Sequence, residues 1–175
     1  YGAGNNKGLS LVKTKYVLIS NPDVIYEDDF FSNLKKYIDE NIEFDIIGPV
    51  YRSNDYASHG YFDDLKNNND EKNTFNNQNL IKTHWIVGCT MFINLNKFED
   101  KKLFDENFFL FFEEFDLCRR VLKKGGKVYA SNKLYVKHLG HKGSAAVDPK
   151  YEKDSKFLRS WHWMWSSFYY YEKNF

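Results

Sequence analysis

Two short apolar runs separated by an amphipathic stretch constrain the fold of this chain more than any other feature. Residues 16–19 are apolar on both faces and stop at the polar turn formed by residues 21–23, and a second apolar run spans residues 44–50. Between them, residues 27–38 place apolar side chains at helical spacing. Because a strand, a helix and a strand in this order form a right-handed parallel crossover, we expect an α/β fold with a mostly parallel sheet flanked by helices.

The rest of the chain continues this alternation. A strand-like run interrupted by Gly88 spans residues 86–95, a helix is predicted over residues 113–124, and two short strands are predicted over residues 127–130 and 134–138. Residues 1–8 are turn-rich and predict a loop that leads into a helix, whereas the polar residues 52–79 predict an exposed excursion. We expect a core domain over residues 1–150, extended by an aromatic helix over residues 151–175.

Composition excludes several classes of protein. The 175 residues suit one domain, and 25 basic against 24 acidic residues give a net charge of +1 without the basic excess of nucleic-acid binding proteins. The longest stretch free of Lys, Arg, Asp and Glu, residues 83–96, falls short of the roughly 20 apolar residues of a membrane-spanning helix. Cys89 and Cys118 lack the close spacing of a zinc or redox pair. Two such cysteines in apolar runs are typical of a protein in the reducing cytoplasm.

Three groups of residues could carry chemistry. The first is the turn Asn21-Pro22-Asp23 at the end of a buried strand, where open α/β sheets place their ligands. A carboxylate there can hold Mg²⁺ or Mn²⁺ against a diphosphate, although the same three residues are also ordinary turn formers.

The second group is the acidic pair Glu113-Glu114, which follows an aromatic run at the start of a predicted helix. An apolar wall and a neighbouring carboxylate both raise a carboxyl pKa, whereas a helix N-terminus lowers it, so the net direction stays open at this point. A raised pKa suits a general base, and the alternative is a first helical turn decorated by acids, with Asp116 pairing with Arg119 or Arg120.

The third group follows the last predicted strand. His138 could ligate a metal, and Lys142 and Ser144 could contact phosphate oxygens, although a histidine in a glycine-rich loop often has no role. Trp85 could stack on a sugar face or belong to the core.

The combination of these sequence motifs, in this order, resembles the family-two glycosyltransferases, especially the rhamnosyltransferase-like members that build bacterial surface polysaccharides. The matching motifs are residues 1–8, 16–23, 85–91 and 104–119, and His138 with Gly140 and Ser144. Residues 159–173 are similar to the family's downstream helix. The resemblance implies a GT-A fold, a nucleotide-sugar donor, a glycan or lipid-linked acceptor, a divalent cation (Mg²⁺ or Mn²⁺), and inversion at the anomeric carbon.

Carried over by position, the resemblance makes Asp23 a metal ligand, in an Asn-Pro-Asp form of the family's Asp-x-Asp motif, and His138 the second protein ligand. The family usually has Glu-Asp where this chain has Glu113-Glu114. Glu114 is therefore the expected catalytic base, one methylene longer than usual, and Glu113 is the alternative. Donor or acceptor contacts are implied at Asn5, Asn6, Trp85, Gly88, Lys142 and Ser144.

One feature departs from a plain member of that family. The segments that hold the nucleotide would precede Tyr1, so we expect an upstream piece in a longer protein and weak donor binding without it. In the aromatic tail, Leu158, Trp161, Trp165 and Phe168 fall near one helical stripe. This stripe could rest at a bilayer interface near a lipid-linked acceptor, or pack onto the sheet or a second subunit. A non-catalytic sugar-binding module and an assembly domain that kept the fold are the alternative functions.

Overall fold

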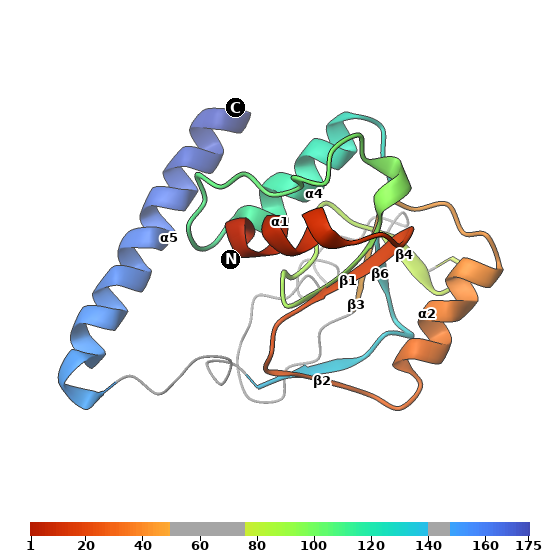
Figure 1. The fold of residues 1–175 in the computed structure, drawn as a ribbon, viewed down its shortest axis with the longest axis horizontal. Helices are drawn as coiled ribbons and strands as arrows, with labels where there is room; N and C mark the ends of the chain where they lie inside the picture. Colours follow the sequence, from red (N-terminus) through yellow and green to blue (C-terminus); the bar gives the residue numbers. More distant parts are fainter. Residues whose placement is uncertain (50–75, 140–147) are drawn as a thin grey trace, which may run out of the picture.

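A five-stranded mixed sheet lies between helices in the computed structural model, which describes residues 1–49, 76–139 and 148–175 (Figure 1). The strands lie in the order β1 (Tyr16–Ser20), β5 (Thr90–Asn94), β3 (Ile46–Pro49), β6 (Val128–Ser131) and β4 (Leu80–Lys82). A separate two-stranded sheet pairs β2 (Val24–Tyr26) with β7 (Val136–His138). The α-helices are α1 (Gly2–Leu11), α2 (Phe30–Asp39), α4 (Glu113–Lys123) and α5 (Glu152–Asn174), and short 3-10 turns span Leu95–Lys97 and Pro149–Tyr151.

The strand pairing is mostly antiparallel, so the prediction of a mostly parallel sheet is wrong. β3 and β6 are parallel, with Ile46 opposite Val128, whereas the β1–β5, β5–β3 and β6–β4 pairs are antiparallel. The cause is β5, which enters between β1 and β3 and runs opposite to both. β1 and β3, the strands of the predicted strand–helix–strand unit, therefore run in the same direction. They do not pair with each other, because β5 lies between them.

The sheet separates two apolar clusters. On one face, Leu9 of α1 and Leu117 of α4 pack with Ile46 and Ile93. On the other face, Phe30, Leu34 and Tyr37 of α2 pack with Ile47 and Phe92. Neighbouring residues Ile46 and Ile47 point to opposite clusters, as the two-residue period of a strand requires, so both faces of the central strands are buried.

The N-terminal segment is helical from its second residue, so the prediction of a turn-rich loop over residues 1–8 is wrong. Asn6 fixes this helix, because its side chain donates to the carbonyl of Phe104 at 2.8 Å and accepts from the Phe104 amide at 2.9 Å. Tertiary contacts thus override the weak helix propensity of the three glycines and two asparagines in this helix. The predicted strand at residues 16–20 and the helix at 113–124 are confirmed, and the 86–95 run becomes a strand only from Thr90. Most of the predicted excursion over residues 52–79 lies outside the described residues.

α5 stands at the edge of the molecule and contacts it along a narrow face (Figure 1). The Ser166 hydroxyl donates to the carbonyl of Leu110 at 2.8 Å, and Tyr170 packs in a small apolar cluster. Near its end, the Lys173 ammonium lies 2.7 Å from Asp105 and 2.8 Å from the fully buried Asp116. α5 is therefore an extension held by specific contacts. In the described ranges, no helix combines the length and the apolar character needed to cross a membrane.

Candidate functional site

The first half of the candidate site is a contact between Asp23 and His138. Asp23 follows β1 in the turn that leads to β2, and the next residue, Val24, pairs with His138 of β7. The Leu139 amide donates to the Asp23 carbonyl at 2.9 Å, and the His138 Nε2 lies 3.1 Å from the Asp23 Oδ1. The pairing of β2 with β7 thus joins two residues that lie far apart in the chain.

This contact is a hydrogen bond between the imidazole and the carboxylate, and the separation of its two atoms also suits a shared divalent cation. Two ligands at neighbouring octahedral positions, each about 2.1 Å from a metal ion, lie about 3 Å apart, and the Asp23 and His138 atoms lie 3.1 Å apart. Within residues 1–49, 76–139 and 148–175, no three His, Cys, Asp or Glu side chains gather as a metal group. A cation at this pair would need water or phosphate oxygens to complete its shell, as Mg²⁺ usually does.

The second half of the site is the start of α4. Glu114 lies against the turn that precedes β5: a Cβ placed on Gly88 would lie 3.3 Å from the Glu114 Cδ and 3.5 Å from the Tyr1 hydroxyl oxygen. The Tyr1 hydroxyl donates to the Gly88 carbonyl. A side chain at position 88 would therefore crowd the Glu114 carboxyl group by a few tenths of an ångström and would be in ordinary contact with the Tyr1 hydroxyl.

Burial decides the charge state of this acidic pair. It raises the pKa of Glu114 to about 7, with a smaller contribution from the charge of Glu113, against backbone hydrogen bonds at Glu114 and Gly88. Burial also raises the pKa of Glu113, which is 3% exposed and whose Oε1 has no hydrogen-bond partner among the described residues. Desolvation therefore outweighs the helix N-terminus, and Glu114 can both accept and release a proton near neutral pH.

Cys89 connects the two halves. The Asn21 amide donates to the Cys89 carbonyl at 2.9 Å, and the Asn21 side chain lies 3.5 Å from the His138 Nε2. Burial raises the pKa of the Cys89 thiol to about 12, and the charges of both Glu114 and Asp23 raise it further. The hydrogen bond from Asn21 to Cys89 and the packing of Glu114 against Gly88 therefore place the Asn21-Pro22-Asp23 turn and the start of α4 beside neighbouring residues of one turn.

The backbone immediately before Glu113 is strained. Phe111 and Phe112 have φ values of 71° and 68°, in the left-handed region that non-glycine residues avoid, at a cost of about 1–3 kcal/mol each. The Phe112 ring packs against Trp163 and Tyr170 at ring-centre distances of 5.2 and 5.4 Å. Packing with α5 therefore holds the backbone conformation that presents the acidic pair.

The other predicted site residues are distributed unevenly. The backbone amide of Asn5 donates to the Tyr1 carbonyl at 3.1 Å, whereas the side-chain amide of Asn6 is occupied by Phe104 and Glu106. Trp85 stacks on Phe115 with ring centres 4.5 Å apart, so one of its faces is covered. The roles of these residues as donor or acceptor contacts stay predictions, and Lys142 and Ser144 lie outside the described residues.

Sequence reasoning missed two features of this site. Burial, with the charges of Glu114 and Glu113, raises the pKa of Tyr1 well above its usual range, so Tyr1 belongs to the acidic cluster. The sequence indicated a role for Tyr1 only indirectly, because Tyr1 lies in the same N-terminal motif, residues 1–8, as Asn5. The strained backbone at Phe111 and Phe112 left no indication, because neither residue is a type that favours positive φ.

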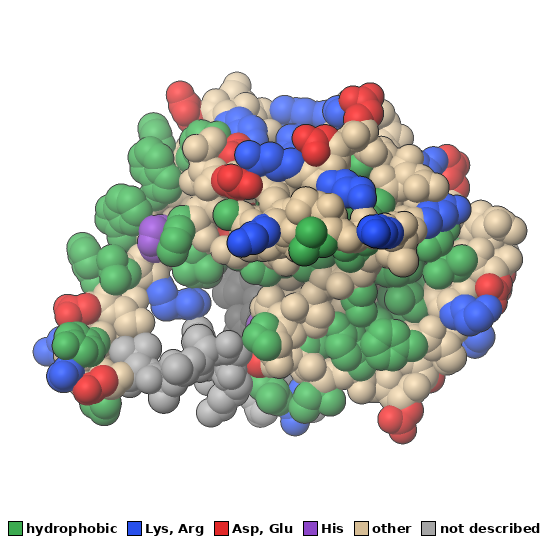
Figure 2. All heavy atoms as spheres, in the orientation of Figure 1, with side chains coloured by type: hydrophobic (Ala, Val, Ile, Leu, Met, Phe, Trp, Pro, Cys, Tyr) green, Lys and Arg blue, Asp and Glu red, His purple; other side chains and the backbone are tan. Residues whose placement is uncertain are grey.

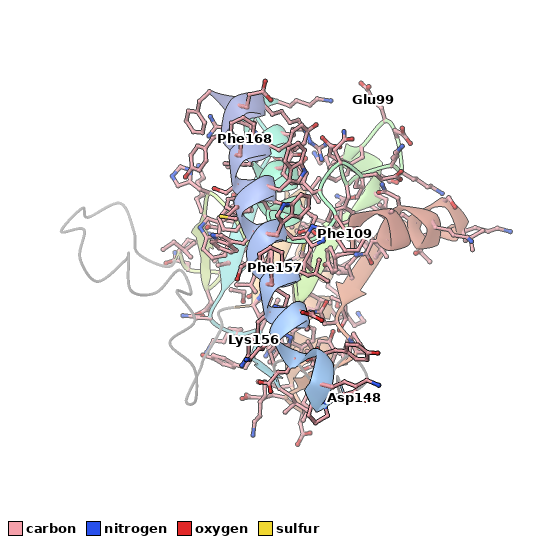
Figure 3. All side chains as sticks on the ribbon, turned by 90° about the vertical axis from the view of Figure 1, so that its left-hand side faces the viewer. Glu99, Phe109, Asp148, Lys156, Phe157 and Phe168 are labelled. Atoms are coloured by element: carbon pink, nitrogen blue, oxygen red, sulfur yellow. The ribbon has the colours of Figure 1, made fainter. Side chains whose placement is uncertain are left out.

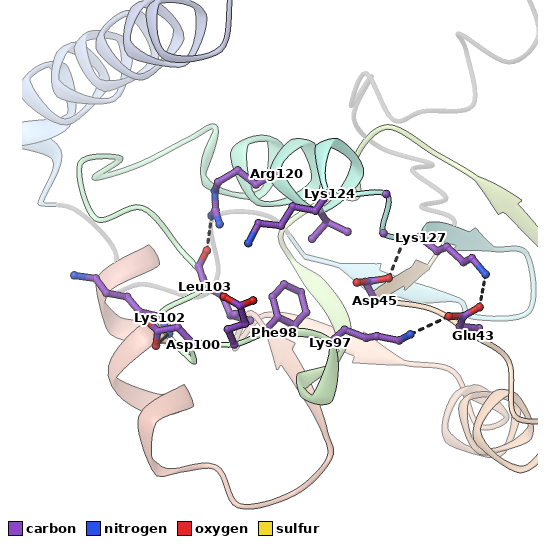
Figure 4. Close-up of a pocket in the computed structure, with 14 residues that line it drawn as sticks. Glu43, Asp45, Lys97, Phe98, Asp100, Lys102, Leu103, Arg120, Lys124 and Lys127 are labelled. Atoms are coloured by element: carbon purple, nitrogen blue, oxygen red, sulfur yellow. Dashed lines mark hydrogen bonds and ion pairs between the residues drawn. The ribbon is translucent and has the colours of Figure 1, made fainter.

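A surface hollow between α4 and the residues after β5 contains none of the predicted site residues (Figure 4). Its walls carry both charges, and the acids there already hold cations: Glu43 contacts Lys97 at 2.9 Å and also Lys127. Glu43 in this hollow is thus paired with cations, and the proposed roles of Asp23, His138 and Glu114 do not involve it.

Comparison with known proteins adds no assignment. No protein-family model matches the chain, and no curated protein sequence matches it at a significant level.

Proposed function

We propose that this chain forms part of a metal-dependent inverting glycosyltransferase that moves a sugar from a nucleotide-sugar donor to a glycan or lipid-linked acceptor. The observation that carries the proposal is that one turn contacts both halves of the site: Glu114 packs against Gly88, and Asn21, two residues before Asp23, donates to the Cys89 carbonyl. A transferase of this kind needs a cation-binding carboxylate and a separate proton-accepting carboxylate around one reacting centre. The GT-A family, a bacterial polysaccharide substrate and a cytoplasmic location are parts of the same proposal.

Glu114 is the proposed base. Its carboxylate accepts the proton of the acceptor hydroxyl while that oxygen forms a bond to the anomeric carbon, and the bond from that carbon to the diphosphate breaks on the opposite side. A single displacement inverts the anomeric centre. A pKa of about 7 supports this role, because a base works best when its pKa lies near the working pH.

Asp23 and His138 are the proposed protein ligands of a Mg²⁺ or Mn²⁺ ion. When bound, such an ion would neutralise the negative charge that develops on the departing diphosphate. The two residues contribute one carboxylate oxygen and one imidazole nitrogen, and their separation of 3.1 Å suits neighbouring positions on one ion. Asn21, within reach of His138, would orient the imidazole.

A transfer assay tests the proposal. The full-length protein, incubated with Mn²⁺, a panel of nucleotide sugars and oligosaccharide acceptors, should release nucleoside diphosphate in an acceptor-dependent way. Asp23→Asn should lower the rate at least about 100-fold, because it removes the anionic ligand of the cation.

Asp28→Asn is the matched control, since Asp28 is exposed and lies five residues further along the same segment. Its rate should equal that of the unmodified protein. Equal rates in the Asp23 variant and the unmodified protein, or a rate unaffected by chelation of divalent cations, would contradict the proposed role of Asp23.

A further inference from the structure

α5 carries an apolar stripe that points away from the rest of the molecule. Large apolar residues recur along it at alternating steps of four and three, at Phe157, Trp161, Met164, Phe168, Tyr171 and Phe175. Each has an exposed fraction between 45% and 82%. Steps of four and three give a repeat of 3.5 residues, which is the pattern of a seam between two packed helices.

The seam lies opposite the face that holds α5 to the core, except at its end, where the Arg119 guanidinium of α4 lies 4.0 Å from the centre of the Phe175 ring. Ser166 and Tyr170, which are buried, lie on the inner face, and Phe157 and Phe168 lie on the outer face seen in Figure 3. Hydrophobic side chains follow α5 along the edge of the molecule in Figure 2. One helix therefore presents two apolar faces, and only the inner one is covered within the described part of the chain.

The area of this seam matches what a dimer needs. Its six exposed fractions together equal about four fully exposed side chains, or roughly 800 Å² at about 200 Å² for each. The largest apolar patch of a typical monomer is about 300–600 Å², whereas a stable interface buries about 800 Å² on each partner. The seam alone is therefore large enough for a standard protein interface.

The charges of α5 favour a protein partner over a bilayer. Helices that lie on membranes carry Lys and Arg beside their apolar face, where these side chains meet anionic lipid headgroups. Residues 160–171 contain no Lys or Arg; Lys153 and Lys156 lie in the first turns of α5, and Lys156 pairs with Glu152 at 2.7 Å. Of the two cations that border this stretch, Arg159 lies over the ring of Phe111, and Lys173 contacts Asp105 and Asp116. Both are directed to the core.

The flanks of the seam also suit helix packing. Small polar residues, Ser160, Ser167 and Asn174, follow one side of it, and Leu158 and Trp165 widen it on the other. Small residues beside a seam let two helices approach closely. Trp165 is already ordered, because it stacks on Trp161 and Tyr169 with interplanar angles of 7° and 6°, so little side-chain freedom is lost on association.

We propose that the outer face of α5 is a homodimer interface, in which the seam of one chain packs against the same seam of a second copy. A two-fold axis makes the interface self-complementary, so one apolar stripe suffices. This inference does not depend on the proposed transferase activity.

Sedimentation velocity of the protein over a concentration series tests this proposal. We expect a species of twice the 20.9 kDa mass computed for these residues. Met164→Lys should weaken dimerisation about 30-fold or more, because it places an unpaired ammonium at the centre of the seam. Leu11→Lys is the control, since Leu11 is an exposed apolar residue of α1 and lies outside the seam; it should leave the dimer unchanged.

Circular dichroism checks that each variant is folded, which we expect because both side chains are exposed. A monomer at every concentration would overturn the proposal, as would a dimer that resists Met164→Lys. Flotation of a monomer with vesicles of phosphatidylcholine and phosphatidylglycerol would overturn it in favour of a bilayer surface.

Discussion

Glu114→Gln is expected to abolish transfer and, at the same time, to stabilise the protein by about 2–3 kcal/mol at about pH 8. The two effects have one cause, because the half-buried, poorly solvated position that makes Glu114 a base also makes its charged form unfavourable. Burial raises its pKa from an ordinary 4.5 to about 7. Stability and activity therefore change in opposite directions in one variant.

The sign of the stability effect follows from proton binding. Between about pH 4.5 and 7 the folded protein holds a proton at Glu114 that the unfolded chain releases, so stability is lost as the pH rises through this window. A neutral Gln does not titrate. The variant should match the unmodified protein below about pH 4.5 and exceed it by the full amount above about pH 7.

Urea unfolding of both proteins across this pH range measures the effect. The control Glu99→Gln changes an exposed glutamate and should leave the free energy of unfolding unaffected at every pH. A constant difference between the Glu114 variant and the unmodified protein, from acid to alkaline pH, would show that the pKa of Glu114 is ordinary.

The transfer rates separate the two adjacent acids. Loss of a general base typically lowers a rate about 10²- to 10⁴-fold, so Glu114→Gln should lose this factor, whereas Glu113→Gln should keep most of the rate. In the unmodified protein the rate should rise about tenfold per pH unit below about pH 7 and level off above it. The reverse pattern in the two variants would assign the base to Glu113.

Gly48→Ala is expected to destabilise the protein by about 1–3 kcal/mol through overpacking. Gly48 lies in the buried central strand β3, and a Cβ there would fall 1.9 Å from the Cγ2 of Ile86. Ile86 is 3% exposed and begins the segment that leads to Gly88, so the clash would also displace the turn next to Glu114.

A double-mutant cycle with Ile86→Ala tests this cause by urea unfolding. Ile86→Ala alone should cost about 2–5 kcal/mol, and it removes the clashing methyl group, so Gly48→Ala should cost far less in its presence. Gly4→Ala is the opposite control: no atom lies within 4 Å of its added Cβ in helix α1, and it should stabilise by about 0.5–1 kcal/mol. Additive costs of Gly48→Ala and Ile86→Ala would contradict the steric explanation.

Local sequence patterns predicted most elements of this fold. The amphipathic spacing of α2 and α4 and the apolar run of β1 correspond to the observed elements within a few residues. Strand pairing was not predictable, because the insertion of β5 between β1 and β3 depends on contacts between distant residues. The helix α1 was missed because Asn6 and its partner Phe104, 98 residues away, stabilise it.

The candidate site was predicted residue by residue but not in its physical chemistry. Chemistry-bearing residue types at the ends of elements identified Asp23, Glu114 and His138. The direction of the pKa shift at Glu114 depends on burial, which outweighs the helix N-terminus only in the folded arrangement of Gly88, Tyr1 and Glu113. The outer seam of α5 was predicted only in part. The stripe expected from the sequence included Leu158 and Trp165, which flank the seam, and left out Met164 and Tyr171, which lie on it.

The most direct test of the central claim is anomalous diffraction from crystals of the protein soaked in Mn²⁺. We expect an anomalous peak at bonding distance from both the Asp23 carboxylate and the His138 Nε2, on the side of the turn that Glu114 faces. Mn²⁺ bound elsewhere, with the contact between Asp23 and His138 unchanged at this pair, would contradict a catalytic metal site.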